Sequence, residues 1–468
     1  MSKDELFEKS VFDIVLEVCI ALLETNLFRD ATERFFEHLP VGATDFSLKN
    51  RENSDKNADE TKNNKRSNTD HILIIAYVIM GDMEDFDYLG EGEVYLDGAC
   101  QSLRPQPVIS ALNEYYEKFN SCGERVKYPW GIETDKRVEA TREKVLKYLK
   151  LSHRDYFVSF TLNTTYGINL ILSQLDKSGF DCVVTSDIEH NSPFLSTMAF
   201  AKRTGLERIV LARGEDGSLP VEEIPEKAVV VVNAASNIDG RKLVNIKDVV
   251  KKVHQTGGMV IIDAAQAMAH SSEVLWKTEA DAICFSAHKM YAPSLGGIVV
   301  RKDLLPKIET GFIGGGMVDD VDRESYLLSS EKNPDHLYTK FESGLQAWGE
   351  IIALGAAIDW LGKLSKKDHK NLEQNYTELF EFLNASEKVH LVNAEPNPTM
   401  SFYVEGLDSH LLGEALGAET IMARTGYFFA HYYLDKVRHL PPLVRFSLGY
   451  HNRPEDIEKV KKMMEKIV

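Results

Sequence analysis

The sequence predicts an α/β fold built on a mostly parallel sheet with helices on its faces. Short apolar runs typical of buried strands recur between residues 157 and 300, and stretches with helical periodicity, such as 246–256, separate them. Polar residues follow directly after several of these runs. Because ligands of such sheets bind at the carboxyl ends of the strands, the pattern also predicts a binding site at that edge.

Seven apolar runs are the expected strands: 157–161, 182–186, 208–211, 229–233, 260–263, 282–286 and 297–300. After about residue 350 the pattern changes to a long helix, expected at 350–364, and then to mixed helices and short strands. This change predicts a smaller C-terminal α+β domain. We therefore expect a large domain over 86–350, whose first residues contribute to the small domain, and a small domain over 351–468.

An N-terminal appendage is expected before this body. Apolar residues recur with helical spacing from about residue 10 to 38, and residues 44–70 are rich in Asn, Asp, Lys, Glu and Ser. Residues 1–85 are therefore predicted to form a helical appendage with a disordered linker. Two interpretations of residues 1–82 stay open: a genuine part of the protein, or the product of a wrongly assigned gene start.

Composition restricts the class of function. With 54 Lys and Arg against 72 Asp and Glu, the 468-residue chain carries a formal charge of -18, which disfavours general binding to nucleic-acid phosphates. No signal peptide is apparent, and the longest apolar run, 72–80, is far shorter than the roughly 20 residues of a membrane-spanning helix. The cysteines are scattered and lack a CxxC pair: Cys19, Cys100, Cys122, Cys182 and Cys284. A cytoplasmic protein without a metal site, a membrane partner or a nucleic-acid partner is the expectation.

Lys289 and Asp263 are the first candidate pair. Lys289 ends Ser286-Ala287-His288-Lys289, directly after an expected strand, where a crowded polar setting can lower the pKa of an amine enough for attack on an aldehyde. Asp263 ends another expected strand, where a buried carboxylate needs a partner such as the N–H of a pyridinium ring. Simpler interpretations stay open, because most lysines are solvated surface charges and an aspartate here suits a helix N-cap.

Other polar residues follow other expected strands. Thr164 and Thr165 precede an apolar helical segment, where hydroxyls and amides can bind a phosphate, although Thr is also a common helix cap. His190 could stack on an aromatic ring or be a structural histidine. Asn237, in Ser-Asn-Ile-Asp-Gly, is typical of a turn. Gln266 comes three residues after Asp263, so that its side chain could reach a hydroxyl group on a ring bound by Asp263.

Arg445 lies between apolar residues in Val-Arg-Phe-Ser-Leu, near the C-terminus. An arginine in such a setting usually binds a carboxylate through two hydrogen bonds. The residue is therefore a candidate for binding an anionic substrate.

In this order and context the candidate residues resemble the fold-type I, class V aminotransferase-like family, whose best-known members are cysteine desulfurases and selenocysteine lyases. The similarity begins with Tyr95-Leu96-Asp97-Gly98-Ala99-Cys100 and ends with residues 445–452. It implies an enzyme that uses pyridoxal 5'-phosphate (PLP), a transferase or lyase, with a small amino acid as substrate. It also implies a homodimer.

The resemblance further implies a role for each candidate. Lys289 would hold PLP as a Schiff base and later move the α-proton of the substrate, Asp263 would pair with the pyridine nitrogen, and His190 would stack on the ring. Gln266 and Asn237 would contact the hydroxyl side of the ring. The phosphate ligands would be Thr165, Ser286 and His288, and the substrate carboxylate would be bound by Arg445 with Arg424 beside it.

Two positions depart from the family pattern. The nucleophilic cysteine of the desulfurases aligns with Phe429, whose phenyl ring cannot accept sulfur, so that Cys100 and Cys122 are two candidate substitutes. The family's Gly-Thr-Pro stretch, whose threonine reaches the phosphate of a neighbouring subunit, reads Gly344-Leu345-Gln346. The hydroxyl that would cross the dimer interface is then missing.

Three functions are compatible with these residues. The leading hypothesis is a PLP enzyme that acts at the α or β carbon of a small amino acid by transamination, β-elimination or epimerisation. The second is a cysteine desulfurase or selenocysteine lyase with a relocated thiol. The third is a module that keeps the fold and binds without catalysis; the intact cofactor positions favour an enzyme over this third hypothesis.

Overall fold

The computed structural model describes residues 84–124 and 126–468, and the account that follows is limited to them. They belong to one unit of the chain, Met80–Val468. The helix expected at 10–38 and the linker expected at 44–70 lie outside the described residues. Among the described helices, none combines the length and the apolar composition needed to cross a membrane.

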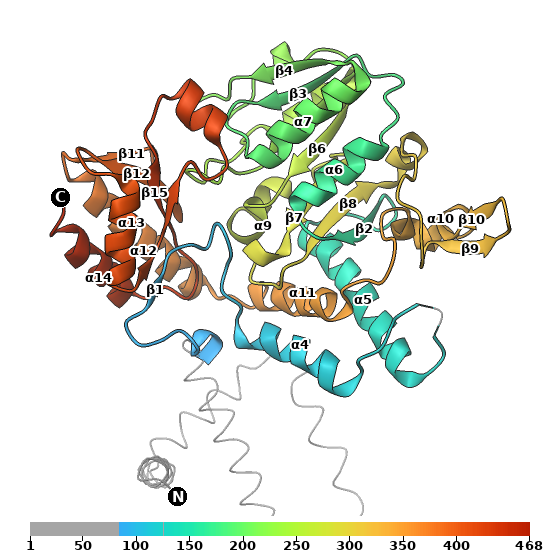
Figure 1. Ribbon diagram of the computed structural model, residues 1–468, viewed down its shortest axis with the longest axis horizontal. Helices are drawn as coiled ribbons and strands as arrows, with labels where there is room; N and C mark the ends of the chain where they lie inside the picture. Colours follow the sequence, from blue (N-terminus) through green and yellow to red (C-terminus); the bar gives the residue numbers. More distant parts are fainter. Residues whose placement is uncertain (1–83, 125) are drawn as a thin grey trace, which may run out of the picture. The chain divides into compact units, whose positions relative to one another are not determined.

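All seven expected strands form, and they lie in one sheet of order β2-β8-β7-β6-β5-β3-β4 (Figure 1). Every neighbouring pair is parallel except the two made by β8, which runs antiparallel to β7 and to β2. The predicted mostly parallel sheet is therefore confirmed. The strands are β2 (Tyr156–Thr161), β3 (Cys182–Ser186), β4 (Glu207–Leu211), β5 (Ala228–Asn233), β6 (Met259–Asp263), β7 (Ala282–Ser286) and β8 (Gly296–Arg301).

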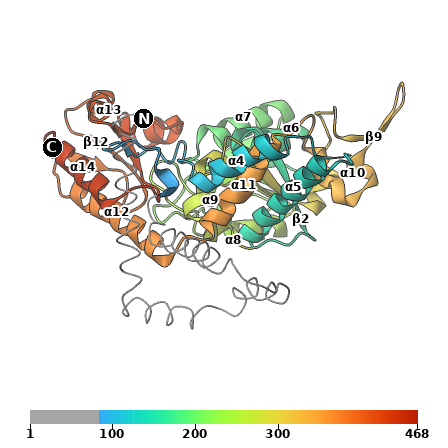
Figure 2. The same cartoon turned by 90° about the horizontal axis from the view of Figure 1, so that it is seen from below.

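Helices cover both faces of this sheet, which explains why its inner strands are continuous apolar runs instead of alternating patterns. In β5, Val229 and Val231 contribute to one apolar core, and Val230 and Val232 contribute to the core on the other face. Figure 2 shows α6 and α7 along one side and α8 along the other. The helices of this part are α4 (Gln106–Lys118), α5 (Pro129–Tyr148), α6 (Thr164–Gln174), α7 (Asn191–Thr204), α8 (Ile246–Gln255), α9 (Ala267–His270) and α11 (Trp348–Leu361).

A second, antiparallel sheet of order β11-β12-β15-β14 lies beside the first and has its own apolar core. The beginning of the described chain joins it, because β1 (Val94–Tyr95) pairs with β13 (Ile421–Met422) and the next turn bridges to β15. The other elements are β11 (Val389–Leu391), β12 (Thr399–Val404), β14 (Arg424–Gly426), β15 (Leu443–Ser447), α12 (Lys366–Asn384), α13 (Ser409–Ala418) and α14 (Pro454–Met464).

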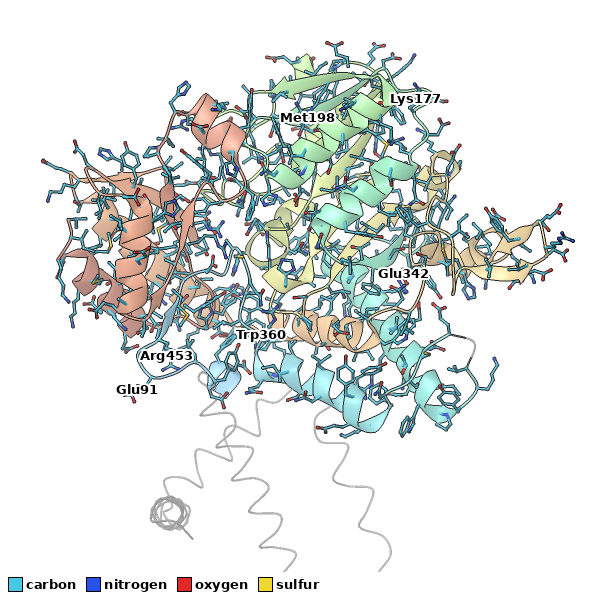
Figure 3. All side chains as sticks on the ribbon, in the orientation of Figure 1. Glu91, Lys177, Met198, Glu342, Trp360 and Arg453 are labelled. Atoms are coloured by element: carbon cyan, nitrogen blue, oxygen red, sulfur yellow. The ribbon has the colours of Figure 1, made fainter. Side chains whose placement is uncertain are left out.

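A hairpin of β9 (Val318–Val321) and β10 (Tyr326–Leu328), followed by α10 (Ser329–Lys332), projects from the large sheet (Figure 1). The chain returns from it through Glu342, which is anchored in the body (Figure 3). Arg142 on α5 donates from Nη1 and Nη2 to the two carboxylate oxygens of Glu342, at 2.7 and 2.8 Å. The two side chains are only 7% and 1% exposed, and the Phe160 amide adds a further hydrogen bond to the same carboxylate at 2.6 Å.

We expect Glu342→Gln to lower the free energy of unfolding by up to about 3–5 kcal/mol, because it removes the buried counter-charge of Arg142. The guanidinium then keeps only Glu139, whose carboxylate lies 3.0 Å from Arg142 Nε and whose side chain is 56% exposed. Urea denaturation followed by fluorescence and circular dichroism measures this. The matched control is Asp359→Asn, which breaks the exposed pair with Lys144, where the Nζ–Oδ2 distance is 2.6 Å. That change should cost less than about 1 kcal/mol. Equal effects of the two substitutions would contradict the anchoring role.

Candidate active site

A cavity of about 620 Å³ opens at the carboxyl ends of the parallel strands, where the small sheet faces the large one. Its wall combines residues that follow β2, β3, β5, β6 and β7 with residues of β14, β15 and the segment between them. Every candidate named from the sequence for binding the cofactor or the substrate lines it: Thr164, Thr165, His190, Asn237, Asp263, Gln266, Ser286, His288, Lys289, Arg424 and Arg445. The structure therefore brings these residues together, with Cys100 beside them, whereas the other candidate thiol, Cys122, is not part of the cavity wall.

Asp263 and Lys289 come together because β6 and β7 are neighbours in the sheet. Asp263 is the last residue of β6 and is buried, and burial raises the pKa of its carboxyl group while the nearby Lys289 opposes that rise. Burial lowers the pKa of the Lys289 amine, and Asp263 opposes that change in turn. One Asp263 oxygen accepts the amide of Ala265 at 2.9 Å. Helix α9 has Gln266 at its N-cap, so Asp263 does not cap that helix.

This pair fits PLP. Burying a charged carboxylate is costly, and the cationic N–H of a protonated pyridine ring would compensate this cost by pairing with Asp263. An amine with a lowered pKa has a larger neutral fraction, and only the neutral amine attacks an aldehyde. The two groups thus match the two ends of the cofactor.

Hydroxyl groups gather at the N-terminus of α6, where helix amides and the helix dipole favour an anion. The Thr164 and Ser286 hydroxyls are 2.7 Å apart, and Ser286 also accepts the Thr164 amide at 3.0 Å. The Thr165 hydroxyl lies 2.5 Å from that of Ser192, a residue that the sequence analysis missed. Burial lowers the pKa of His288 to about 4, so its imidazole is neutral at physiological pH. This corner can hold a phosphate.

His190 is fixed at the N-cap of α7. Its Nδ1 accepts the Ser192 amide at 3.0 Å, so the proton of the neutral ring lies on Nε2. Burial lowers the His190 pKa to about 3. A neutral imidazole held in one orientation can pack on an aromatic cofactor ring.

The side-chain amides of Gln266 and Asn237 each donate to a backbone carbonyl group. Gln266 Nε2 donates to the carbonyl oxygen of Ala99 at 2.7 Å. Asn237 Nδ2 donates to the carbonyl oxygen of Phe428 at 2.7 Å. Both residues therefore connect the large sheet to segments that carry the small-sheet side of the site.

Two arginines share one carboxylate on that side. Arg424 and Arg445 are directly opposite in the β14–β15 ladder. Arg424 Nε and Nη2 donate to Asp97 at 3.0 and 2.7 Å, and Arg445 Nη2 lies 3.3 Å from Asp97 Oδ1. The sequence analysis quoted Asp97 in a motif but gave it no role. Two guanidinium groups and one aspartate leave a net positive charge, which suits one further carboxylate.

Arg445 is the more deeply placed of the two arginines. It is 2% exposed, and its Nη1 donates to the carbonyl oxygen of Asn237 at 2.9 Å. Its Nε is buried and has no hydrogen-bond partner among the described residues. A buried donor without a partner is costly, which marks this atom as a contact for a ligand.

Phe429, which the resemblance noted in the sequence aligns with a nucleophilic cysteine, lies at the mouth of the cavity with about half of the residue exposed. Its ring centroid is 5.5 Å from that of His190. Phe428 and Phe429 both have positive φ, at 47° and 59°, which is unfavourable for aromatic residues. The Asn191 amide donates to the Phe429 carbonyl oxygen at 2.6 Å and helps to hold this backbone. The loop is therefore fastened to the N-terminus of α7.

Glu189 is a buried acid beside His190 in the chain, and the sequence analysis missed it because glutamate is usually a solvated surface residue. It is 1% exposed; its carboxylate accepts the Ser186 hydroxyl at 2.5 Å and the Asn233 amide at 2.9 Å. Burial raises its pKa from 4.5 to about 7. The acid thus joins the ends of β3 and β5 next to His190.

Because the folded-state pKa of Glu189 is raised, its contribution to stability is fully present below about pH 4.5 and is lost as the pH rises to about 7 and beyond. We expect wild type to lose up to about 3 kcal/mol relative to Glu189→Gln between pH 5 and pH 8. Urea denaturation of both proteins across this range tests the difference. The exposed Glu207→Gln on β4 should parallel wild type. A constant difference between wild type and Glu189→Gln would contradict the assignment.

Comparison with known proteins gives a consistent picture. The family model for aminotransferase class-V matches residues 94–460. A probable cysteine desulfurase of Vibrio cholerae is 27% identical over 390 residues, covering 81% of this chain and 94% of that protein. One from Halalkalibacterium halodurans is 28% identical over 396 residues, covering 82% and 95%.

Solved structures agree. The apo cysteine desulfurase of Thermococcus onnurineus has a TM-score of 0.72 at 26% identity, covering 81% of this chain and 95% of that one. A cystine C-S lyase, in complex with its product cysteine persulfide, has a TM-score of 0.65 at 17% identity, covering 79% and 96%, which is a likeness of fold alone. The chain therefore belongs to the class-V aminotransferase family and is a PLP-dependent enzyme of fold type I.

Proposed function

We propose that this enzyme removes sulfur from L-cysteine by cleaving its Cβ–S bond, the second of the functions predicted from the sequence. Arg445 lines the same cavity as Lys289, and its buried Nε has no hydrogen-bond partner among the described residues; this juxtaposition is the main support for the proposal. An amino acid whose carboxylate is bound by Arg445 would therefore occupy the cavity that also holds the Lys289 amine. The relatives named cysteine desulfurases, matched over about four fifths of the chain, support a thiol substrate over transamination and epimerisation of other amino acids.

When bound, PLP supplies an electron sink that weakens bonds at the α and β carbons of an amino acid. The chain's own residues position it. Lys289 holds the cofactor and moves the proton at the substrate's α-carbon, Asp263 binds the ring N–H, and His190 packs on the ring face. Gln266 and Asn237 would contact the hydroxyl side of the ring. The phosphate is held by Thr164, Thr165, Ser286 and His288, with Ser192 beside them.

Arg445 binds the substrate carboxylate in this proposal, and Arg424 keeps Asp97 in place. Because the two arginines bring one more positive charge than Asp97 neutralises, the carboxylate enters a site of complementary charge. The Phe428 ring centroid lies 4.8 Å from the Arg445 guanidinium. This contact limits the conformations of the Arg445 side chain. The small amino acid predicted from the sequence suits this confined corner.

A second candidate is β-elimination, which converts cysteine and water to pyruvate, ammonia and sulfide without any protein thiol. Phe429 at the position of the family's cysteine favours it, and one neighbour of the same fold is named a cystine C-S lyase. The product separates the two: desulfuration forms alanine, and elimination forms pyruvate. Membership of an enzyme family speaks against a module that binds without catalysis.

Three further expectations stay proposals. A homodimer is supported by Leu345, which is 77% exposed in the segment where the family reaches the neighbouring phosphate. The cytoplasmic location predicted from the cysteine pattern stays a prediction. The division into a large domain over 86–350 and a small domain over 351–468 is supported by the two separate sheets and their cores.

We expect Lys289→Ala to lose the visible absorbance of the lysine-bound cofactor and to lower alanine formation from L-cysteine by about 10²–10⁴-fold, since it removes both the attachment point and the proton carrier. Borohydride reduction of wild type, followed by peptide mass spectrometry, should locate the cofactor on Lys289. The exposed Lys247→Ala on α8 is the matched control and should behave as wild type. A wild-type protein that stays colourless after loading with PLP, or a cofactor fixed on another lysine, would refute the proposal.

A further inference from the structure

Removal of sulfur as a persulfide needs an acceptor thiol, and Phe429 cannot provide it. Of the cysteines that the structure describes, Cys182 and Cys284 are buried within β3 and β7. Cys122 is exposed in the connection between α4 and α5 and is not part of the cavity wall. Cys100 lines the cavity together with Lys289 and is partly exposed to it.

We propose that Cys100 is the nucleophile that accepts the substrate's sulfur, an inference that rests on the proposed function. The sequence alone left Cys100 and Cys122 as equal candidates. Their positions in the structure separate them.

The backbone that carries Cys100 is fixed on both sides of the site. The Cys100 amide donates to the Asp97 carbonyl oxygen at 3.0 Å, closing a tight turn. The neighbouring Ala99 donates its amide to the Ser447 hydroxyl on β15 at 3.0 Å and accepts the Gln266 side chain at 2.7 Å. The backbone at Cys100 is thus fixed between the small sheet and Gln266, which follows β6 of the large sheet. A cysteine on a mobile surface segment would have no such fixed position.

Arg424 gives this sulfur a cationic partner. Its Nη2 lies 2.8 Å from Cys100 Sγ while the same guanidinium binds Asp97. The sulfur is also close enough to Lys289 and Arg445 to act electrostatically on both. A sulfur beside fixed positive charges is the usual setting of a reactive cysteine.

An independent observation shows that a ligand belongs at this corner. The Arg445 side chain is only 3% exposed, and its Nε has no hydrogen-bond partner among the described residues. A carboxylate bound there is next to Asp97, the residue from which the Cys100 turn begins. The substrate and the acceptor thiol then share one end of the cavity.

The chemical step balances without an added oxidant or reductant. The Cys100 sulfur attacks the sulfur of bound L-cysteine, forming an S–S bond while the substrate's Cβ–S bond breaks. The electron pair of the broken bond stays with Cβ, which takes up a proton. L-cysteine and the Cys100 thiol become L-alanine and a Cys100 persulfide, and an external thiol can then release the sulfur.

The test treats the full-length, PLP-loaded enzyme with equimolar L-cysteine in the absence of oxygen and reducing agent, followed by alkylation and peptide mass spectrometry. We expect one additional sulfur on the Cys100 peptide of wild type and of the matched control Cys122→Ser. Cys100→Ser should lack it and should form alanine at least about tenfold more slowly while keeping the absorbance of lysine-bound PLP. If the serine variant does not keep that absorbance, Cys100→Ala takes its place.

The outcomes separate the inference from the function on which it rests. Alanine formation with the additional sulfur on a cysteine other than Cys100, or alanine formation undiminished in Cys100→Ser, overturns the inference and leaves the desulfurase proposal intact. Pyruvate without alanine overturns both. Additional sulfur on Cys100 in wild type and in Cys122→Ser supports both.

Discussion

The site depends on two opposite charges held at the ends of neighbouring strands. Asp263 and Lys289 are far apart in the chain, yet the parallel pairing of β6 and β7 delivers them to one cavity. Burial disfavours the charged form of each, and each partly compensates the other. A cofactor that offers a ring N–H to the acid and an aldehyde to the amine gives each buried group a partner. The arrangement of the strands therefore suits PLP.

A second set of charges joins the small sheet to this arrangement. Asp97 follows β1, which pairs with the C-terminal part of the chain, and its carboxylate binds both Arg424 and Arg445. The same turn positions Cys100. The carboxylate site and the thiol thus come from residues more than 300 positions apart, and the pairing of β1 with β13 is what unites them. In the proposed function, substrate recognition depends on the small sheet, whereas cofactor binding depends on the large one.

The sequence predicted the parts of the structure that depend on local pattern. The inner strands of the large sheet are largely apolar runs, and Asp263 and Lys289 are recognisable because they end or closely follow such runs. The missed residues act through contacts that no local pattern encodes. Glu189 is an ordinary acid until the sheet buries it against Asn233, and Ser192 matters because helices α6 and α7 lie side by side. Cys100 and Cys122 are likewise equivalent in the sequence, and only the folding of the chain places Cys100 in the cavity wall and Cys122 outside it.

The most direct test is a crystal structure of the purified protein loaded with PLP. The account predicts electron density that is continuous from Lys289 Nζ into the cofactor, with an Asp263 oxygen at about 2.7–3.1 Å from the ring nitrogen and the His190 ring against the cofactor face. Cofactor density elsewhere, or an unmodified Lys289 with Asp263 bound to a different group, would contradict it.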